Sequence, residues 1–210
     1  MQKGSGSVAK FDLTPLSPLA AVAVPGRYGK ATGGTPPVVL KERRGLKLCV
    51  IAAFGGQESV VEEAFRKITG LELPRGPKRA VAKGLALIGT APGQWLAVAE
   101  DADARQMLDA LAKQLAGHAA ITEQSDSKAV IRISGTRARE VLAKGCSLDL
   151  HPRVFKPGDA ATTPVALIDC QLWQVDDTPS YDLAVPSSFA ESFWSWLAAS
   201  SAEYGYTVEV

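Results

Sequence analysis

The segment Ile131–Gly158, IRISGTRAREVLAKGCSLDLHPRVFKPG, decides how this chain is organised. It continues the apolar run Ala129–Ile133, whose β-branched residues favour a strand. Ser134–Thr136 interrupts this run, and a hydroxyl there can cap the amphipathic helix that follows. Gly145 suits the left-handed position that ends a helix. The segment therefore predicts a strand, a turn, a short helix and an irregular basic loop.

The composition is that of an ordinary globular chain. Its 210 residues, 46% hydrophobic and 21% charged, suffice for one sizeable domain or two small ones that share a core. The net charge of +1 gives no reason to expect nucleic acid or an anionic membrane as a partner. No targeting segment and no run of ~18–20 apolar residues is visible. Cys49, Cys146 and Cys170 form no C-x-x-C pair, which favours a reduced compartment and indicates a cytoplasmic protein.

Two similar units follow an extended N-terminal segment. Residues 1–45 are rich in Gly, Pro, Ser and Thr but also contain leucines and valines, so we expect them to lie across this domain or a neighbour. In residues 46–126 the pattern predicts a strand at 46–54, a helix at 58–68, strands at 85–89 and 94–98, a helix at 103–115 and a strand at 119–123. Residues 127–210 repeat this order at 130–133, 137–143, 163–168, 181–185, 188–199 and 206–210, with 172–175 as an extension or partner of the strand before it. Tandem βαββαβ units predict an α+β fold, packed as a pseudo-duplicate with helices on one face of each sheet.

The sequence contains no recognisable catalytic motif. No G-x-G-x-x-G or Walker A run occurs, so a bound dinucleotide is not expected. His118 suits a surface cap at a helix end, and His151 near Cys146 lacks the third orienting group that an activated nucleophile needs. Asp176–Asp177 predicts a hairpin tip rather than paired catalytic carboxylates. The basic loop 74–84 could contact a phosphate, although a solvated or salt-bridging loop is the default. We expect no catalytic, cofactor-binding or metal-binding residue on this chain.

The C-terminal helix carries an informative aromatic pattern. A single buried face is predicted for Phe189, Phe193, Trp196 and Leu197, spaced i, i+4, i+7 and i+8. Trp194 projects roughly 140° away from Phe189, so it is either covered by the other half of the chain or available to another protein. Six residues are predicted to contact a partner: Leu16, Leu19, His151, Arg153, Phe155 and Trp194.

Long motifs in this sequence closely resemble one family. RxxLAKGCxxDLHPxxFxPG spans residues 139–158, and SFAxSxWxWL spans residues 188–197. With PGQWLAVAE at 92–100 and LTPLSPL at 13–19, they resemble the gamma subunits of heterotetrameric sarcosine oxidase over about residues 12–205. Only the segments 27–44 and 74–84 look specific to this chain and not typical of that family.

The resemblance implies a place in an assembly of alpha, beta, gamma and delta subunits. Such assemblies oxidatively demethylate sarcosine to glycine, with hydrogen peroxide and either 5,10-methylenetetrahydrofolate or formaldehyde as products. FAD, FMN and NAD, together with the site for the substrate tetrahydrofolate, belong to the larger subunits, and zinc belongs to the smallest. The gamma subunit is similar in fold to the folate-binding domain of the glycine-cleavage T-protein family. No catalytic residue of that wider family matches a position here, so the resemblance implies a structural, non-catalytic subunit.

Two alternatives stay open. A free-standing folate-binding one-carbon-transfer protein of the T-protein class would need an acidic site and usually a longer chain. A folate-binding accessory or RNA-modification factor would need a reactive, exposed cysteine, for which Cys146 is the candidate. Under the subunit interpretation, we expect residues 12–26 and the loop 145–158 to contact a neighbouring subunit.

Overall fold

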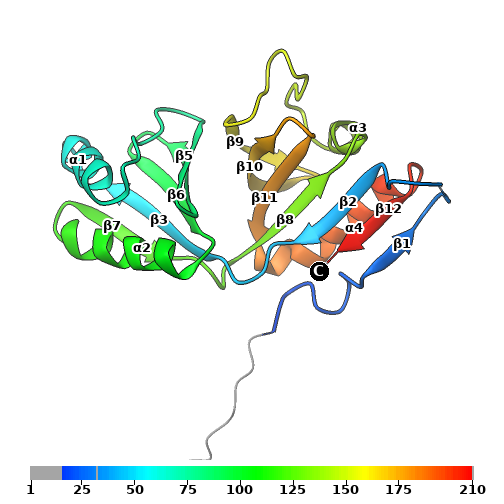
Figure 1. Ribbon diagram of the computed structural model, residues 1–210, viewed down its shortest axis with the longest axis horizontal. Coiled ribbons are helices and arrows are strands. Elements are labelled where there is room, and N and C mark those ends of the chain that lie inside the picture. Colours follow the sequence, from blue (N-terminus) through cyan, green and yellow to red (C-terminus); the bar gives the residue numbers. More distant parts are fainter. Residues whose placement is uncertain (1–15, 32, 210) are drawn as a thin grey trace, which may run out of the picture.

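A computed structural model describes residues 16–31 and 33–209, which form two β-sheets that face each other and carry helices on their outer sides (Figure 1). Alternating apolar side chains explain this arrangement, because each sheet has one face for its helices and one face for the other sheet. In the described residues, no helix is both long and apolar enough to cross a membrane. The observed mixture of elements confirms the predicted α+β class.

The first unit contains a five-stranded antiparallel sheet in the order β4-β5-β6-β3-β7. Its elements are β3 (Lys47–Ala53), α1 (Glu58–Thr69), β4 (Arg79–Ala82), β5 (Leu85–Ala91), β6 (Gln94–Ala99), α2 (Ala102–Gln114) and β7 (Ala119–Glu123). The Asp101 side chain accepts a hydrogen bond from the Ala104 backbone N–H at 2.8 Å and so caps α2. The predicted hairpin turn at 92–93 joins β5 to β6.

The second unit contains a seven-stranded sheet in the order β1-β12-β2-β8-β11-β10-β9. Its later elements are β8 (Lys128–Ser134), α3 (Ala138–Ala143), β9 (Ala160–Val165), β10 (Ile168–Asp176), β11 (Ser180–Pro186), the 3₁₀ turn η1 (Ser187–Phe189), α4 (Ala190–Ser201) and β12 (Tyr206–Glu209). The stretch 172–175, left open by the sequence pattern, belongs to β10, which pairs with both β9 and β11.

The N-terminal part of the chain adds two strands that the sequence pattern did not predict. They are β1 (Gly26–Tyr28) and β2 (Val38–Glu42), and both join the sheet of the second unit. β2 lies between β8 and β12, antiparallel to the first and parallel to the second. These strands are short and flanked by Gly and Pro, and their partners lie far along the sequence, so local pattern does not reveal them.

Both units follow the order β-α-β-β-β-α-β, one strand more than predicted. The additional strand of the first unit is β4, which forms within the segment 74–84 that was predicted to be a basic loop. In the first unit, β3 and β7 pair directly. In the second unit, the equivalent strands β8 and β12 are separated by β2. The duplication is therefore regular in order, and the N-terminal segment is inserted into one copy.

Three apolar clusters stabilise this arrangement. One lies between the first sheet and helices α1 and α2, and another lies between the second sheet and helices α3 and α4. The third joins the two sheets, and its larger members are Leu48, Ile88, Leu96, Val98 and Trp173. The space between the sheets is thus filled by packed side chains over this region.

Candidate functional site

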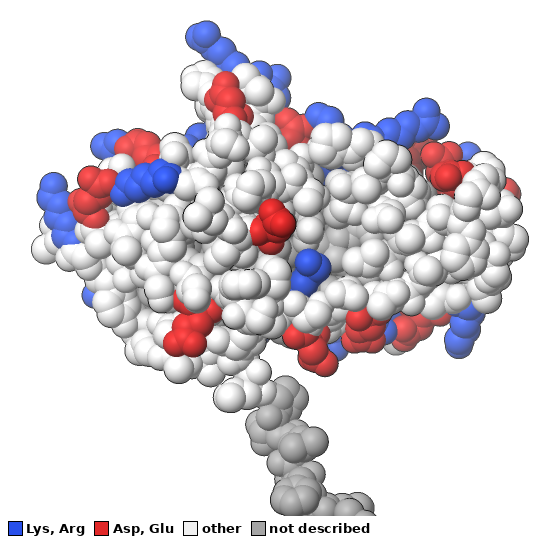
Figure 2. All heavy atoms as spheres, turned by 180° about the vertical axis from the view of Figure 1, so that it is seen from behind, with Lys and Arg blue, Asp and Glu red and all other residues white. Residues whose placement is uncertain are grey.

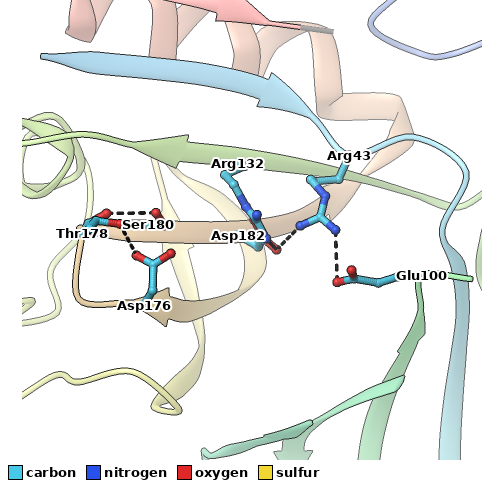
Figure 3. Close-up of polar contacts among 7 residues, drawn as sticks. All are labelled: Arg43, Glu100, Arg132, Asp176, Thr178, Ser180 and Asp182. Atoms are coloured by element: carbon cyan, nitrogen blue, oxygen red, sulfur yellow. Dashed lines mark hydrogen bonds and ion pairs between the residues drawn. The ribbon is translucent and has the colours of Figure 1, made fainter. Parts of the chain in front are cut away.

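A network of ion pairs, centred on the buried carboxylate of Asp182, connects residues of the two units (Figure 3). Asp182 on β11 is 3% exposed and is paired in register with Arg132 on β8. Its two carboxylate oxygens accept hydrogen bonds from Arg132 Nε at 2.6 Å and Nη2 at 2.7 Å. Arg43, in the link between β2 and β3, lies 3.3 Å from Asp182 and 3.0 Å from Glu100, which follows β6. The network therefore connects both sheets and the link between them.

Arg79 on β4 brings a third guanidinium close to this network. Burial lowers the pKa of Arg79, and the carboxylates of Asp182 and Glu100 act in the opposite direction. Its Nε is buried and has no hydrogen-bond partner among the described residues. Burial also disfavours the charged form of Arg132, yet its hydrogen bonds to Asp182 raise the pKa of Arg132 overall. Three arginines thus lie around the buried carboxylate of Asp182, and Arg43 also reaches the exposed carboxylate of Glu100.

Both carboxylates of this network are engaged by guanidinium groups. Each carboxylate of the network is held by at least one guanidinium, so neither is a free base aimed at an open cavity. Asp182, Arg132 and their neighbours were not predicted. The sequence does contain one indication of this pair: a charged residue lies inside each of two apolar strands, AVIRIS and SYDLAV. An unpaired charge at such a position would be costly, so each charged residue needs a partner.

A second connection between the units involves the segment 74–84. The Arg79 backbone N–H donates to Gly158 O at 2.7 Å, and the Ala160 N–H donates to Pro77 O at 3.0 Å. The Lys78 ammonium forms an ion pair with Asp159. The basic segment therefore joins β4 to the loop before β9, which agrees with the salt-bridging alternative.

The predicted partner-contact residues divide into two groups. Leu19, Phe155 and Trp194 are only 0%, 8% and 3% exposed and belong to the core of the second unit, so their side chains pack against this chain itself. Leu16 is 85% exposed, and His151 and Arg153 are also exposed. Residues 12–15 of the predicted contact segment lie outside the described residues.

The prediction of which aromatic residues of the C-terminal helix are buried is wrong for the first of them, Phe189. Phe189 is 52% exposed, although it was assigned to the buried face. It lies in η1, where the 3₁₀ turn has about three residues per turn, so the spacing of an α-helix does not apply to it. Trp194 is covered by the chain itself, together with Phe193 and Leu197.

The cysteines and histidines form no reactive pair. All three cysteines are buried free thiols, and burial raises the pKa of Cys170 to about 12. Burial also raises the pKa of Cys146, the predicted nucleophile candidate. His151 Nδ1 accepts a hydrogen bond from the Arg153 backbone N–H at 3.2 Å. His118 Nδ1 lies 2.9 Å from Gln57 Oε1. Within the described part of the chain, no three His, Cys, Asp or Glu residues are grouped to hold a metal ion.

The Asp176–Asp177 pair lies at the tip of the β10–β11 hairpin, as predicted. Asp176 accepts a hydrogen bond from Thr178 Oγ1 at 2.7 Å, and Ser180 Oγ donates to the Thr178 carbonyl at 2.9 Å (Figure 3). These bonds close the tip of the hairpin. Asp176 is therefore part of a turn.

Comparisons with known proteins agree with the fold and the sequence motifs. Residues 51–203 match the model of the sarcosine oxidase gamma subunit family. Curated relatives include sarcosine oxidase subunit gamma of Corynebacterium sp. (strain U-96), 31% identical over 67% of this chain and 69% of that protein. The protein of the same name from Arthrobacter sp. is 29% identical over 90% of each chain.

Solved structures give the same assignment. A chain of the heterotetrameric sarcosine oxidase from Corynebacterium sp. U-96, in complex with pyrrole 2-carboxylate, superimposes with a TM-score of 0.77 at 28% identity. The match covers 90% of this chain and 96% of that chain. The glycine cleavage system aminomethyltransferase T from Bartonella henselae shares the fold, with a TM-score of 0.61 at 16% identity over 80% of this chain and 47% of that one. By its sequence and its fold, the chain belongs to the sarcosine oxidase gamma subunit family.

Proposed function

We propose that this chain is the structural, non-catalytic gamma subunit of a heterotetrameric sarcosine oxidase. Its partners are the alpha, beta and delta subunits, and the assembly oxidatively demethylates sarcosine to glycine in the cytoplasm. The products are hydrogen peroxide and either 5,10-methylenetetrahydrofolate or formaldehyde. FAD, FMN, NAD and zinc are carried by the other subunits, and tetrahydrofolate is a substrate bound there. The contribution of this chain is a folded surface that holds its neighbours.

The proposal is carried by the likeness to a chain of a heterotetrameric sarcosine oxidase along nearly the whole of both chains. The surface supports it as well. Figure 2 shows a broad face across both units on which charged side chains are sparse, while most Lys, Arg, Asp and Glu lie near its upper and lower edges. Depletion of charged residues is typical of the centre of a protein interface. A subunit that is buried in an assembly would use such a face.

The interior of the chain also supports a non-catalytic role. Leu96, Trp173 and the other apolar residues of the inter-sheet cluster pack against one another, and the adjacent carboxylates are paired with arginines. A folate in this space would have to displace packed side chains, so the described residues between the sheets do not fit that ligand.

The alternative function is a free-standing folate-binding one-carbon-transfer protein of the T-protein class. The observation in its favour is the shared fold with an aminomethyltransferase, of which this chain covers 47%. Native mass spectrometry and a flavin absorbance spectrum of the chain purified from its own host distinguish the two functions. A yellow complex with two larger subunits and a small one supports the gamma subunit. A colourless monomer that binds tetrahydrofolate in a titration supports the alternative and overturns the proposal.

Two segments are proposed to contact neighbouring subunits. One is the described part of the predicted N-terminal contact, residues 16–26. The other is the loop 145–158, which projects from the top of the molecule in Figure 1. The loop presents the exposed side chains of His151 and Arg153, and Val154 is 61% exposed. We expect hydrogen exchange to slow in both segments on assembly, and unchanged exchange in both would contradict this assignment.

A further inference from the structure

A groove of about 620 Å³ lies where the N-terminal turn meets the two links between the units. Leu16 and Pro18 line one side of it. Most of the remaining lining comes from the link 43–46 and from the segment 125–130, which includes the start of β8. Its apolar lining includes Leu46 together with the buried residues Leu48, Ala129 and Val130. The groove is thus built from several distant segments of the chain.

Most charges in this groove already have partners. Arg44 Nε forms an ion pair with Glu42 at 2.6 Å, and Ser17 Oγ also donates to Glu42. Arg43 is held by Glu100 and Asp182. The remaining cation is Lys128, the first residue of β8.

Lys128 is half-buried and forms no ion pair with any residue that the structure describes. Burial lowers the pKa of Lys128, which reflects the loss of water around its ammonium group. Asp126, the other carboxylate of the groove beside Glu42, is exposed and remains solvated. The ammonium group of Lys128 has lost part of its hydration, and an incoming carboxylate would offset that loss.

The rim of the groove presents a large apolar side chain to solvent. Leu16 is 85% exposed, whereas Leu19, three residues later, is fully buried. The Leu19 backbone N–H donates to Ser17 Oγ at 2.9 Å, and Ser17 in turn is bonded to Glu42. The turn that carries Leu16 is therefore anchored to β2. A small anion in the groove would leave this apolar rim uncovered, whereas a polypeptide segment would cover it.

We propose that this groove docks a segment of another subunit that places a carboxylate against Lys128 and apolar side chains against Leu16 and Leu46. The inference rests on the proposed function and names the chemistry of one contact in that assembly. The carboxylate supplies the missing counter-charge, and the apolar flanks match the lining of the groove. Charge complementarity of this kind gives specificity to an interface.

The test is competitive incorporation into the complex. The variant chain and a wild-type chain with a mass tag are co-expressed with limiting amounts of the other subunits, and native mass spectrometry gives the ratio of the two chains in the complex. Lys128→Glu is expected to reduce incorporation about 30-fold or more, since breaking a close interfacial charge pair has effects of this size. Lys128→Met removes the positive charge without adding a negative one, so it tests the same contact if Lys128→Glu fails to fold. Lys113→Glu, an exposed charge reversal on α2, is the matched control and should incorporate like wild type.

A photo-crosslinking amino acid in place of Leu16 identifies the occupant. A crosslink to another subunit supports the proposal. A crosslink confined to this chain, or equal incorporation of the Lys128→Met and Lys113→Glu variants, would overturn it. If not even the tagged wild-type chain enters a complex, the proposed function fails instead, so the two failures are distinguishable.

Discussion

The buried carboxylate of Asp182 provides the sharpest test of how the two units are held together. In Asp182→Asn, an amide of nearly the same size replaces the carboxylate. The amide NH₂ group then faces guanidinium groups that donated to an oxygen before. Arg43, Arg79 and Arg132 are left in a partly dehydrated space with Glu100 as their counter-charge. We expect the variant to fold but to be clearly destabilised.

The magnitude follows from the burial of the pair. Removing one partner of a fully buried ion pair costs about 3–5 kcal/mol. Asp182 is 3% exposed, but the Arg132 side chain is 26% exposed and can regain some water, so we expect the lower end, about 3 kcal/mol. In a chain of this size that corresponds to a fall in Tm of about 6–12 °C. Urea unfolding followed by circular dichroism measures the free energy, and calorimetry measures Tm.

Two further variants make this test specific. Asp177→Asn makes the same chemical change at the exposed hairpin tip and should leave Tm unchanged. Arg132→Met should destabilise the wild-type chain more than it destabilises the Asp182→Asn variant, because the ion pair between Arg132 and Asp182 is already broken in Asp182→Asn. Equal stability of the Asp182→Asn and Asp177→Asn variants would show that the buried carboxylate does not stabilise the chain.

Three other predictions concern the thiols, the glycines and the projecting loop. Burial raises the pKa of Cys170 from 9.0 to about 12, so the stability that depends on its neutral thiol is complete below about pH 9 and is lost toward pH 12. The difference in unfolding free energy between wild type and Cys170→Ala should therefore shrink over that range, and a constant difference would contradict the assignment. Gly89→Ala should cost about 3 kcal/mol in urea unfolding, because its Cβ would overlap the Gly76 carbonyl oxygen, whereas Gly55→Ala, with open space around it, should not destabilise the chain. Arg153→Glu should reduce incorporation into the complex at unchanged Tm, and unchanged incorporation would remove the loop from the proposed interface.

Elements with a strong local signal could be predicted from the sequence. Helix α2 has an apolar stripe and an acidic cap at Asp101, and the β5–β6 hairpin has a Pro-Gly turn, so each is specified by neighbouring residues. The family motif at 139–158 could also be recognised, because it is long and contains residues such as Gly145. The left-handed conformation expected for Gly145 is not observed, because its φ is not positive. An alanine Cβ at Gly145 would press on Trp196 and the Ala166 backbone, so packing is the reason for glycine there.

Features that depend on distant contacts could not be predicted. Whether Phe155 and Trp194 contact a partner or the chain itself is decided by the fold around them, and their residue types suit both. The pairing of Arg132 with Asp182 requires the register of β8 and β11, which lie about 50 residues apart in sequence. A charged residue inside an apolar strand indicates only that some partner exists.

The insertion of β2 gives the N-terminal segment a role that its composition conceals. In the first unit β3 pairs directly with β7, so that sheet is complete within one unit. In the second unit β2 pairs with both β8 and β12. Without β2, one edge of β8 and one edge of β12 would lose the strand to which they are hydrogen-bonded. The same strand leads into Arg43, which contacts Asp182 in one unit and Glu100 beside the other. The segment that completes the second sheet therefore also carries the ion pairs that join the two units, and it is the same segment whose turn forms one wall of the Lys128 groove.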